Sequence, residues 1–286
     1  MMHDDTTRRE FLLGTAAAGV TLAAGLREAR AAKTLPYGRN ARPLSEVRIG
    51  FVGVGGMGSG HVRNLLRIPG ARITAVCDIV EARVKRAQDW VEQAGQPRPT
   101  GYSRGETDFV RLCESEDLDL VYNATPWNWH VPICLSAMKN GKHAATEVPA
   151  ALTVEDCWKL VETAEKTGLY CIMMENCCYG RPELLVLHLA RKGMLGEIVH
   201  AECGYMHDLR AIKLAPGGEG DWRWKFSIDM NGNNYPTHGL GPVAQCMNIN
   251  RGDAFDFLVS MSSPPLGLNL YAQEHLRPDD PRRLHR

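Results

Sequence analysis

The chain has 286 residues, of which 44% are hydrophobic and 23% charged, a composition typical of a globular protein with room for two domains of ordinary size. Lysine plus arginine and aspartate plus glutamate number 33 each, so neither a nucleic-acid partner nor a disordered acidic chain is indicated. The nine cysteines lack C-x-x-C spacing and the histidines lack H-x-x-x-H spacing, so we predict mostly buried thiols and no metal site.

Residues 1–32 are typical of an export signal. Arg8 and Arg9 precede Phe11, a soft apolar stretch rich in alanine and glycine follows, and Ala-Arg-Ala at 29–31 suits cleavage. This order resembles a twin-arginine signal, which implies a periplasmic or extracellular protein; an ordinary amphipathic tail is the alternative. The apolar stretch is too short to cross a bilayer, so no membrane span is expected. Residues 33–45 are interpreted as a linker.

From residue 46 to residue 176, strand-like and helix-like segments alternate. This alternation predicts an α/β fold with a doubly wound parallel sheet. One helix has clear ends, because Thr153 can cap its start and Gly168 can end it in a left-handed conformation. We expect strands at 47–54, 71–77, 118–124, 142–146 and 169–174, and helices at 56–66, 80–94, 127–140 and 154–167.

Residues 177–286 have a different pattern. Helices are expected at 182–191 and 236–249, and strand-like runs lie at 197–206 and 255–261. This pattern predicts the start of a second domain that contains both helices and strands, with no evident end before residue 286.

A dinucleotide fingerprint follows the first predicted strand. Residues 53–58 read Gly-Val-Gly-Gly-Met-Gly, in which Gly53 permits the tight turn, Gly55 lets the backbone approach a pyrophosphate, and Gly58 lets helix and strand pack closely. Asp78 ends the second strand, where a carboxylate accepts ribose hydroxyls and repels a 2′-phosphate, so NAD is favoured over NADP. The alternative is a structural glycine turn beside a surface aspartate.

Two further loops follow strands in the same way, at 124–130 and 146–149. The carboxyl ends of parallel strands are where ligands bind in such sheets. His130, taken alone, is as readily interpreted as a helix-capping or core histidine.

With these features in order, the sequence resembles the Gfo/Idh/MocA oxidoreductase superfamily. The resemblance rests on the glycine fingerprint, Asp78, Thr125-Pro126 with His130, Gly141-Lys142-His143, and Glu147-x-Pro149. It implies a Rossmann domain followed by an open-faced sheet domain that carries the substrate site. Many members have lysine between the Glu and the Pro, where it assists proton transfer, whereas this chain has Val148.

The chain is more specifically similar to glycoside hydrolase family 109, NAD-dependent α-N-acetylgalactosaminidases. The similarity is carried by 127–130, 147–149, 174–179, 221–224 and 233–242. It implies NAD contacts at Gly56, Met57, Asp78, Trp127, Asn128, Trp129, His130, Glu147, Val148, Asn176 and Tyr235. It implies substrate contacts at Tyr205, Arg223, Tyr235, Pro236, Thr237 and His238.

The chemistry implied is a redox-assisted cleavage. Ordinary glycosidases place two carboxylates across the bond, and here Glu175 and Asp221 are candidates by residue type only. NAD instead permits transient oxidation at C3, loss of the C2 proton, elimination at C1, addition of water and re-reduction. His238 suits the proton transfer, and we assign catalytic roles to it and to three tyrosines, Tyr235, Tyr205 and Tyr179.

Less specific interpretations remain beside this one. His238 and Thr237 lie at a helix start and can serve as caps, and Arg223 can stack on Trp222 or Trp224 instead of holding substrate. The competing functions are a sugar oxidoreductase that releases NADH and a truncated, non-catalytic nucleotide-binding protein. The expected partner is a small molecule or glycan, and self-association is also considered.

Overall fold

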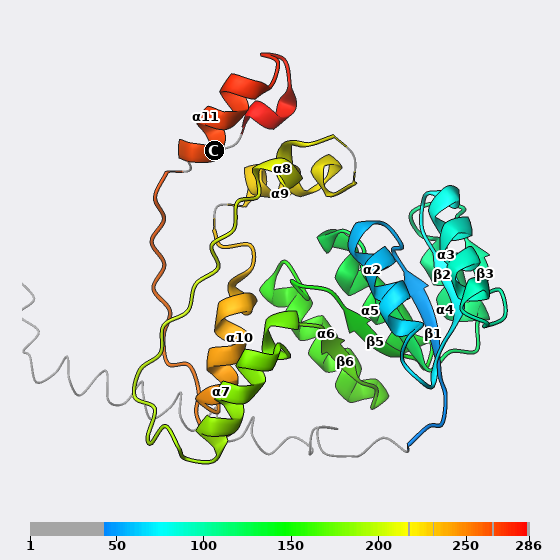
Figure 1. The fold of residues 1–286 in the computed structure, drawn as a ribbon, viewed down its shortest axis with the longest axis horizontal. Helices are drawn as coiled ribbons and strands as arrows, with labels where there is room; N and C mark the ends of the chain where they lie inside the picture. Colours follow the sequence, from blue (N-terminus) through cyan, green and yellow to red (C-terminus); the bar gives the residue numbers. More distant parts are fainter. Residues whose placement is uncertain (1–42, 217, 231, 265, 285–286) are drawn as a thin grey trace, which may run out of the picture. The chain divides into compact units, whose positions relative to one another are not determined.

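The computed structural model describes residues 43–216, 218–230, 232–264 and 266–284 (Figure 1). The expected export signal and nearly all of the expected linker lie outside these residues. Six strands form one fully parallel sheet in the order β3-β2-β1-β4-β5-β6, which confirms the predicted doubly wound arrangement. The strands are β1 (Val47–Val52), β2 (Ala71–Cys77), β3 (Thr100–Tyr102), β4 (Leu120–Asn123), β5 (His143–Thr146) and β6 (Cys171–Met173).

Both faces of the sheet are covered by helices. Neighbouring side chains on a strand point to opposite faces, so Phe51 packs with α2 (Gly56–Leu65) and α3 (Glu81–Gln93), whereas Val52 belongs to the cluster on the other face. That second cluster includes residues of α4 (Asp108–Ser115), α5 (His130–Lys139) and α6 (Val154–Thr167). Because helices cover both faces of the sheet, the central strands are nearly continuous apolar runs.

Helix α6 begins and ends where the sequence predicts. The Thr153 hydroxyl accepts a hydrogen bond from the Asp156 N–H at 3.1 Å, and Gly168 ends the helix with φ of 70°. Leu160 is the buried residue of this helix, whereas Trp158 is 62% exposed.

The chain after β6 is mainly helical. It contains α7 (Arg181–Arg191), α8 (Arg210–Leu214), α9 (Arg223–Asp229), α10 (Pro236–Cys246) and α11 (Leu266–His275). Short 3-10 turns are η1 (Trp127–Trp129), η2 (Asn176–Cys178), η3 (Gly218–Asp221) and η4 (Pro281–Leu284). No helix in the described ranges is long and apolar enough to cross a bilayer.

The strands expected at 197–206 and 255–261 do not form. Between Met173 and residue 284 the described chain contains no strand, so the open-faced sheet expected of the second part is absent there. A strand needs hydrogen-bonded neighbours, and these two segments pair with nothing in the sheet. Their apolar side chains are exposed accordingly, with Leu258 at 90% and Val199 at 86%.

Two histidines of the Rossmann domain make its stability depend on pH. Burial lowers the pKa of His130 and of His143 below the ordinary value, and His143 Nδ1 accepts the Tyr170 N–H at 2.9 Å, which requires a neutral ring. A lowered pKa means that the unfolded chain binds protons first. The stability contribution is therefore complete above about pH 6.5 and is lost as the pH falls through the folded-state pKa.

We expect thermal unfolding to shift to lower temperature between about pH 7 and about pH 5. His143→Asn keeps an oxygen acceptor for the Tyr170 N–H and removes the titrating ring, so the variant should lose less stability over that range. Equal pH dependence in variant and parent would contradict this assignment.

Candidate active site

The turn between β1 and α2 is built so that only glycine fits. Gly53 has φ of +85°, and a Cβ there would lie 2.6 Å from the Ala124 carbonyl oxygen. A Cβ on Gly58 would lie 1.8 Å from the Gly53 carbonyl oxygen. Gly55 caps α2, whose first turn holds Gly56, Met57 and Gly58 and has no acidic side chain. The N–H groups of a first helical turn lack intrahelical partners, so this turn fits a pyrophosphate.

Asp78 lies beside this turn at the end of β2. The residue is 7% exposed. Its carboxylate accepts hydrogen bonds from the N–H groups of Val54 at 3.0 Å and Val80 at 2.9 Å. Arg83 approaches the same carboxylate at 3.6 Å. Carboxylate oxygens have further lone pairs to accept ribose hydroxyls. The residues at this switch point of the sheet therefore fit a dinucleotide with an unphosphorylated ribose.

The loops after β4 and β5 meet the C-terminal part of the chain in one aromatic cluster. Trp127, Val148 and Tyr235 are its buried residues, 3%, 6% and 5% exposed. The Trp127 ring lies 5.4 Å from the Tyr235 ring and 4.9 Å from that of Phe226, measured between centroids. Tyr235 is thus held directly against the ligand-binding edge of the Rossmann sheet.

The His130 ring lies in the protein interior, between the loops after β4 and β5. It is fully buried, with Nδ1 2.6 Å from the Pro149 carbonyl oxygen and Nε2 2.9 Å from that of Thr125. The buried ring ties together the loops after β4 and β5, and the NAD contact implied for His130 stays a prediction. The Trp129 ring packs on the Phe109 ring, with 5.8 Å between centroids, beside the core cluster on the sheet face covered by α4, α5 and α6.

Glu147 has a partner that sequence reasoning missed. Its Oε1 lies 2.5 Å from His61 Nε2 on α2, and its Oε2 accepts the Val148 N–H at 3.3 Å. The His61 side chain is 24% exposed and the Glu147 side chain is 15% exposed. This pair joins the helix of the glycine turn to the loop after β5, across the predicted nucleotide site.

His238 is paired with Glu175, which follows β6. His238 Nδ1 lies 2.6 Å from Glu175 Oε1, and the same oxygen accepts the Cys177 N–H at 3.0 Å. The two side chains are 13% and 5% exposed. Burial raises the pKa of Glu175, but the contacts with Thr237, His238 and the Cys177 N–H outweigh it and hold that pKa below the ordinary value. The carboxylate is therefore ionised and orients the imidazole.

Tyrosines surround the His238 ring. Tyr235 stacks on it at 5.2 Å with 11° between the planes, and Tyr205 lies 5.0 Å away. Arg223 donates a hydrogen bond to the Tyr235 hydroxyl and lies over the Trp127 and Trp222 rings, each at 5.8 Å. Arg223 therefore stacks on indoles and also contacts a candidate catalytic group, and its substrate contact stays a prediction.

In the described part of the chain, the other predicted site residues lie outside the group of rings that packs around His238. Tyr179 is 64% exposed, and no ring contact described for residues 43–284 joins it to His238. Thr237 is partly buried beside Glu175. Met57, Asn128, Asn176 and Pro236 are exposed.

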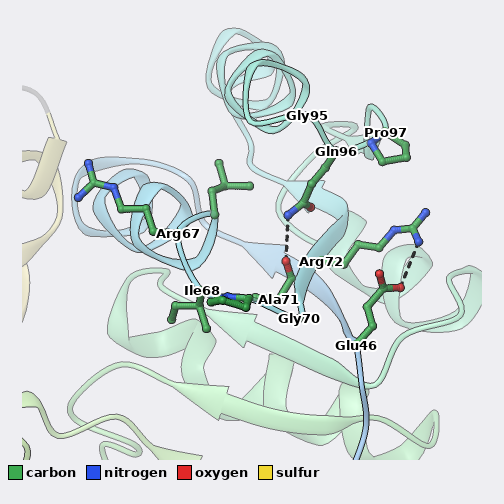
Figure 2. Close-up of a pocket in the computed structure, with 11 residues that line it drawn as sticks. Glu46, Arg67, Ile68, Gly70, Ala71, Arg72, Gly95, Gln96 and Pro97 are labelled. Atoms are coloured by element: carbon green, nitrogen blue, oxygen red, sulfur yellow. Dashed lines mark hydrogen bonds and ion pairs between the residues drawn. The ribbon is translucent and has the colours of Figure 1, made fainter.

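A surface hollow of about 540 Å³ lies elsewhere (Figure 2). It is lined by the turn before β2 and by the segment before β3, where the Gln96 amide bonds to Ala71 O and Ile73 N. These are the amino ends of strands, opposite to the ligand-binding edge. Arg72 in its wall is paired with Glu46 at 3.1 Å. We assign no role in catalysis to this hollow.

Comparison with known proteins divides the chain in two. Residues 47–175 match the oxidoreductase family with NAD-binding Rossmann fold, and residues 179–285 match the C-terminal domain of glycosyl hydrolase 109. A scyllo-inositol dehydrogenase from Lactobacillus casei, solved with NAD(H) and scyllo-inositol, is 19% identical with a TM-score of 0.56. That likeness covers 71% of this chain and 56% of the dehydrogenase, and it shows the fold alone.

Two curated relatives are each described as a glycosyl hydrolase family 109 protein. The one from Solibacter usitatus is 44% identical over 281 residues, which is 98% of this chain and 64% of the relative. The one from Shewanella woodyi is 48% identical over 240 residues, or 84% of this chain and 51% of the relative. The chain is therefore similar to the oxidoreductase family with NAD-binding Rossmann fold over residues 47–175 and to glycosyl hydrolase family 109 proteins over most of its own length, while it spans less than two thirds of these relatives.

Proposed function

We propose that the protein is an NAD-dependent glycosidase that cleaves N-acetyl-α-galactosaminides. The observation that carries this proposal is the Glu175–His238 pair, with Tyr235 between it and the loops at the carboxyl edge of the NAD-binding sheet. An oriented histidine beside a nicotinamide site suits removal of a proton next to a transient ketone.

Bound NAD supplies a reversible hydride acceptor for the sugar C3, so that the C2 proton is acidified, the C1 substituent is eliminated, water adds and C3 is reduced again. The chain supplies the proton transfers. Because Glu175 accepts the Nδ1–H of His238, the other ring nitrogen has a free lone pair with which to take the C2 proton. The Tyr235 hydroxyl accepts a hydrogen bond from Arg223, and the Tyr235 ring stacks on the His238 ring.

Val148 favours this cycle over net sugar oxidation. It is 6% exposed and packs with Trp127 and Tyr235, so an aliphatic side chain, which cannot transfer a proton, stands between Glu147 and Pro149. A sugar oxidoreductase that releases NADH is the second candidate, supported by the fold shared with the inositol dehydrogenase.

The two candidates are separated by incubating the protein with an aryl N-acetyl-α-galactosaminide, with and without added NAD. We expect release of the aryl alcohol that depends on NAD, without net NADH absorbance. Accumulation of NADH in proportion to sugar would favour the oxidoreductase, and release of the aryl alcohol by protein freed of NAD would defeat the proposal.

We also propose export by the twin-arginine route, motivated by Arg8 and Arg9 ahead of the apolar stretch. Replacing both with lysine should retain the protein in the cytoplasm, as measured by cell fractionation. Undiminished export of the lysine variant would rule the route out.

A further inference from the structure

Three side chains of different chemistry converge at the end of β6. One ligand atom each from Glu175, Cys177 and His238 lie within 4.8 Å of one another. Glu175 is deeply buried, and its second oxygen, Oε2, has no partner in hydrogen-bond geometry in the described part of the chain. The Asn176 side-chain amide donates a long hydrogen bond of 3.8 Å to the Cys177 sulfur.

We propose that Glu175, Cys177 and His238 bind one thiophilic divalent cation, with Zn²⁺ as the best match. Carboxylate, thiolate and imidazole are the three side chains that zinc prefers, at about 2.0–2.3 Å each, which needs a small rotation of side chains from the present separation. A thiolate and a carboxylate cancel the charge of the ion, so the loaded site is neutral, as its burial requires. The fourth position remains open to water.

Binding changes the protons in a defined way. The Cys177 thiol releases its proton to solvent as the metal–sulfur bond forms. The metal takes the Nδ1 lone pair of His238, so the ring proton that donated to Glu175 moves to Nε2. The product is one cation bound and one proton released. A ring with its proton on Nε2 cannot accept another proton there, so the cation switches off the base.

This switch rests on the proposed function, whereas the binding itself does not. The test therefore begins with binding alone. Co²⁺ is titrated into the full chain, and a thiolate-to-cobalt charge-transfer band in the near ultraviolet is followed with Zn²⁺ as competitor. We expect one equivalent to bind, with release of one proton measured in two buffers of different ionisation enthalpy.

Cys177→Ser should abolish the charge-transfer band and weaken Zn²⁺ binding by more than the roughly 10–100-fold that loss of an outer hydrogen-bond partner costs. Cys157→Ser is the matched control, since that thiol is exposed on α6 and outside the cluster. Absence of a thiolate band in the parent protein, or equal loss in the Cys157 variant, would overturn the site.

The regulatory consequence is measured separately. Zn²⁺ should inhibit NAD-dependent cleavage of the aryl glycoside, a chelator should restore it, and Cys177→Ser should stay active and resist the ion. Cobalt binding with a thiolate band but no inhibition would retain the metal site and reject the role of His238 as base. If the same Zn²⁺ concentration also inhibits the Cys177 variant, this site is not the cause of the zinc inhibition.

Discussion

Glu175→Gln is expected to lower kcat by about 10²–10⁴-fold while leaving NAD binding unchanged. Glu175 accepts the Nδ1–H of His238 at 2.6 Å and is 5% exposed at its side chain. A glutamine of the same shape can present an N–H to that nitrogen, which favours the tautomer with its proton on Nε2. The base would then carry a proton where it needs a lone pair.

The measurement is steady-state cleavage of the aryl glycoside together with calorimetric NAD titration. Glu165→Gln on α6 is the matched control, because it removes an exposed carboxylate outside the cluster. An unchanged kcat for Glu175→Gln would mean that the pair is structural and that another group removes the C2 proton.

Gly58→Ala should weaken NAD binding by about 100-fold or more. Its new methyl group would lie 1.8 Å from the Gly53 carbonyl oxygen, so α2 must move away from the β1 turn. Two charge-assisted hydrogen bonds from the helix start to the pyrophosphate, worth about 1.5–3 kcal/mol each, are lost by such a shift. Folding stability should also fall, by about 1–3 kcal/mol for the overpacking.

Gly60→Ala on the same helix is the internal control. A Cβ at Gly60 has no heavy atom within 4 Å, so alanine should be neutral or stabilise the helix by about 0.5–1 kcal/mol. Calorimetry gives the NAD affinity of both variants, and urea unfolding gives their stability. Similar NAD affinity in the two variants would show that the Gly53–Gly58 turn does not cradle the dinucleotide.

The Rossmann domain could be predicted because its signals are local. The glycine turn, the apolar runs and the Thr153 and Gly168 caps each act within one element, and their order dictates the sheet. Elements with weak local signals were missed: β3 has three residues, and α4 precedes a strand without strong punctuation.

The candidate site was only partly predictable. Position at a strand end indicated Trp127, but nothing in the spacing pairs Glu175 with His238, which lies 63 residues further along the chain. The same holds for His61 and Glu147, 86 residues apart. Such pairs depend on tertiary packing. The predicted strands at 197–206 and 255–261 did not form for a related reason, because alternating apolar residues favour a strand only when a neighbouring strand completes the ladder.

The most direct test of the whole account is cleavage of the aryl N-acetyl-α-galactosaminide in D₂O, with deuterium located in the released sugar by NMR. Redox-assisted elimination predicts solvent deuterium at C2 and the original hydrogen at C3, because the C2 proton passes through a group that exchanges with solvent and the hydride returns to its own carbon. A product that keeps its original hydrogen at C2 would contradict removal of that proton and leave His238 and the NAD-binding domain without their proposed roles.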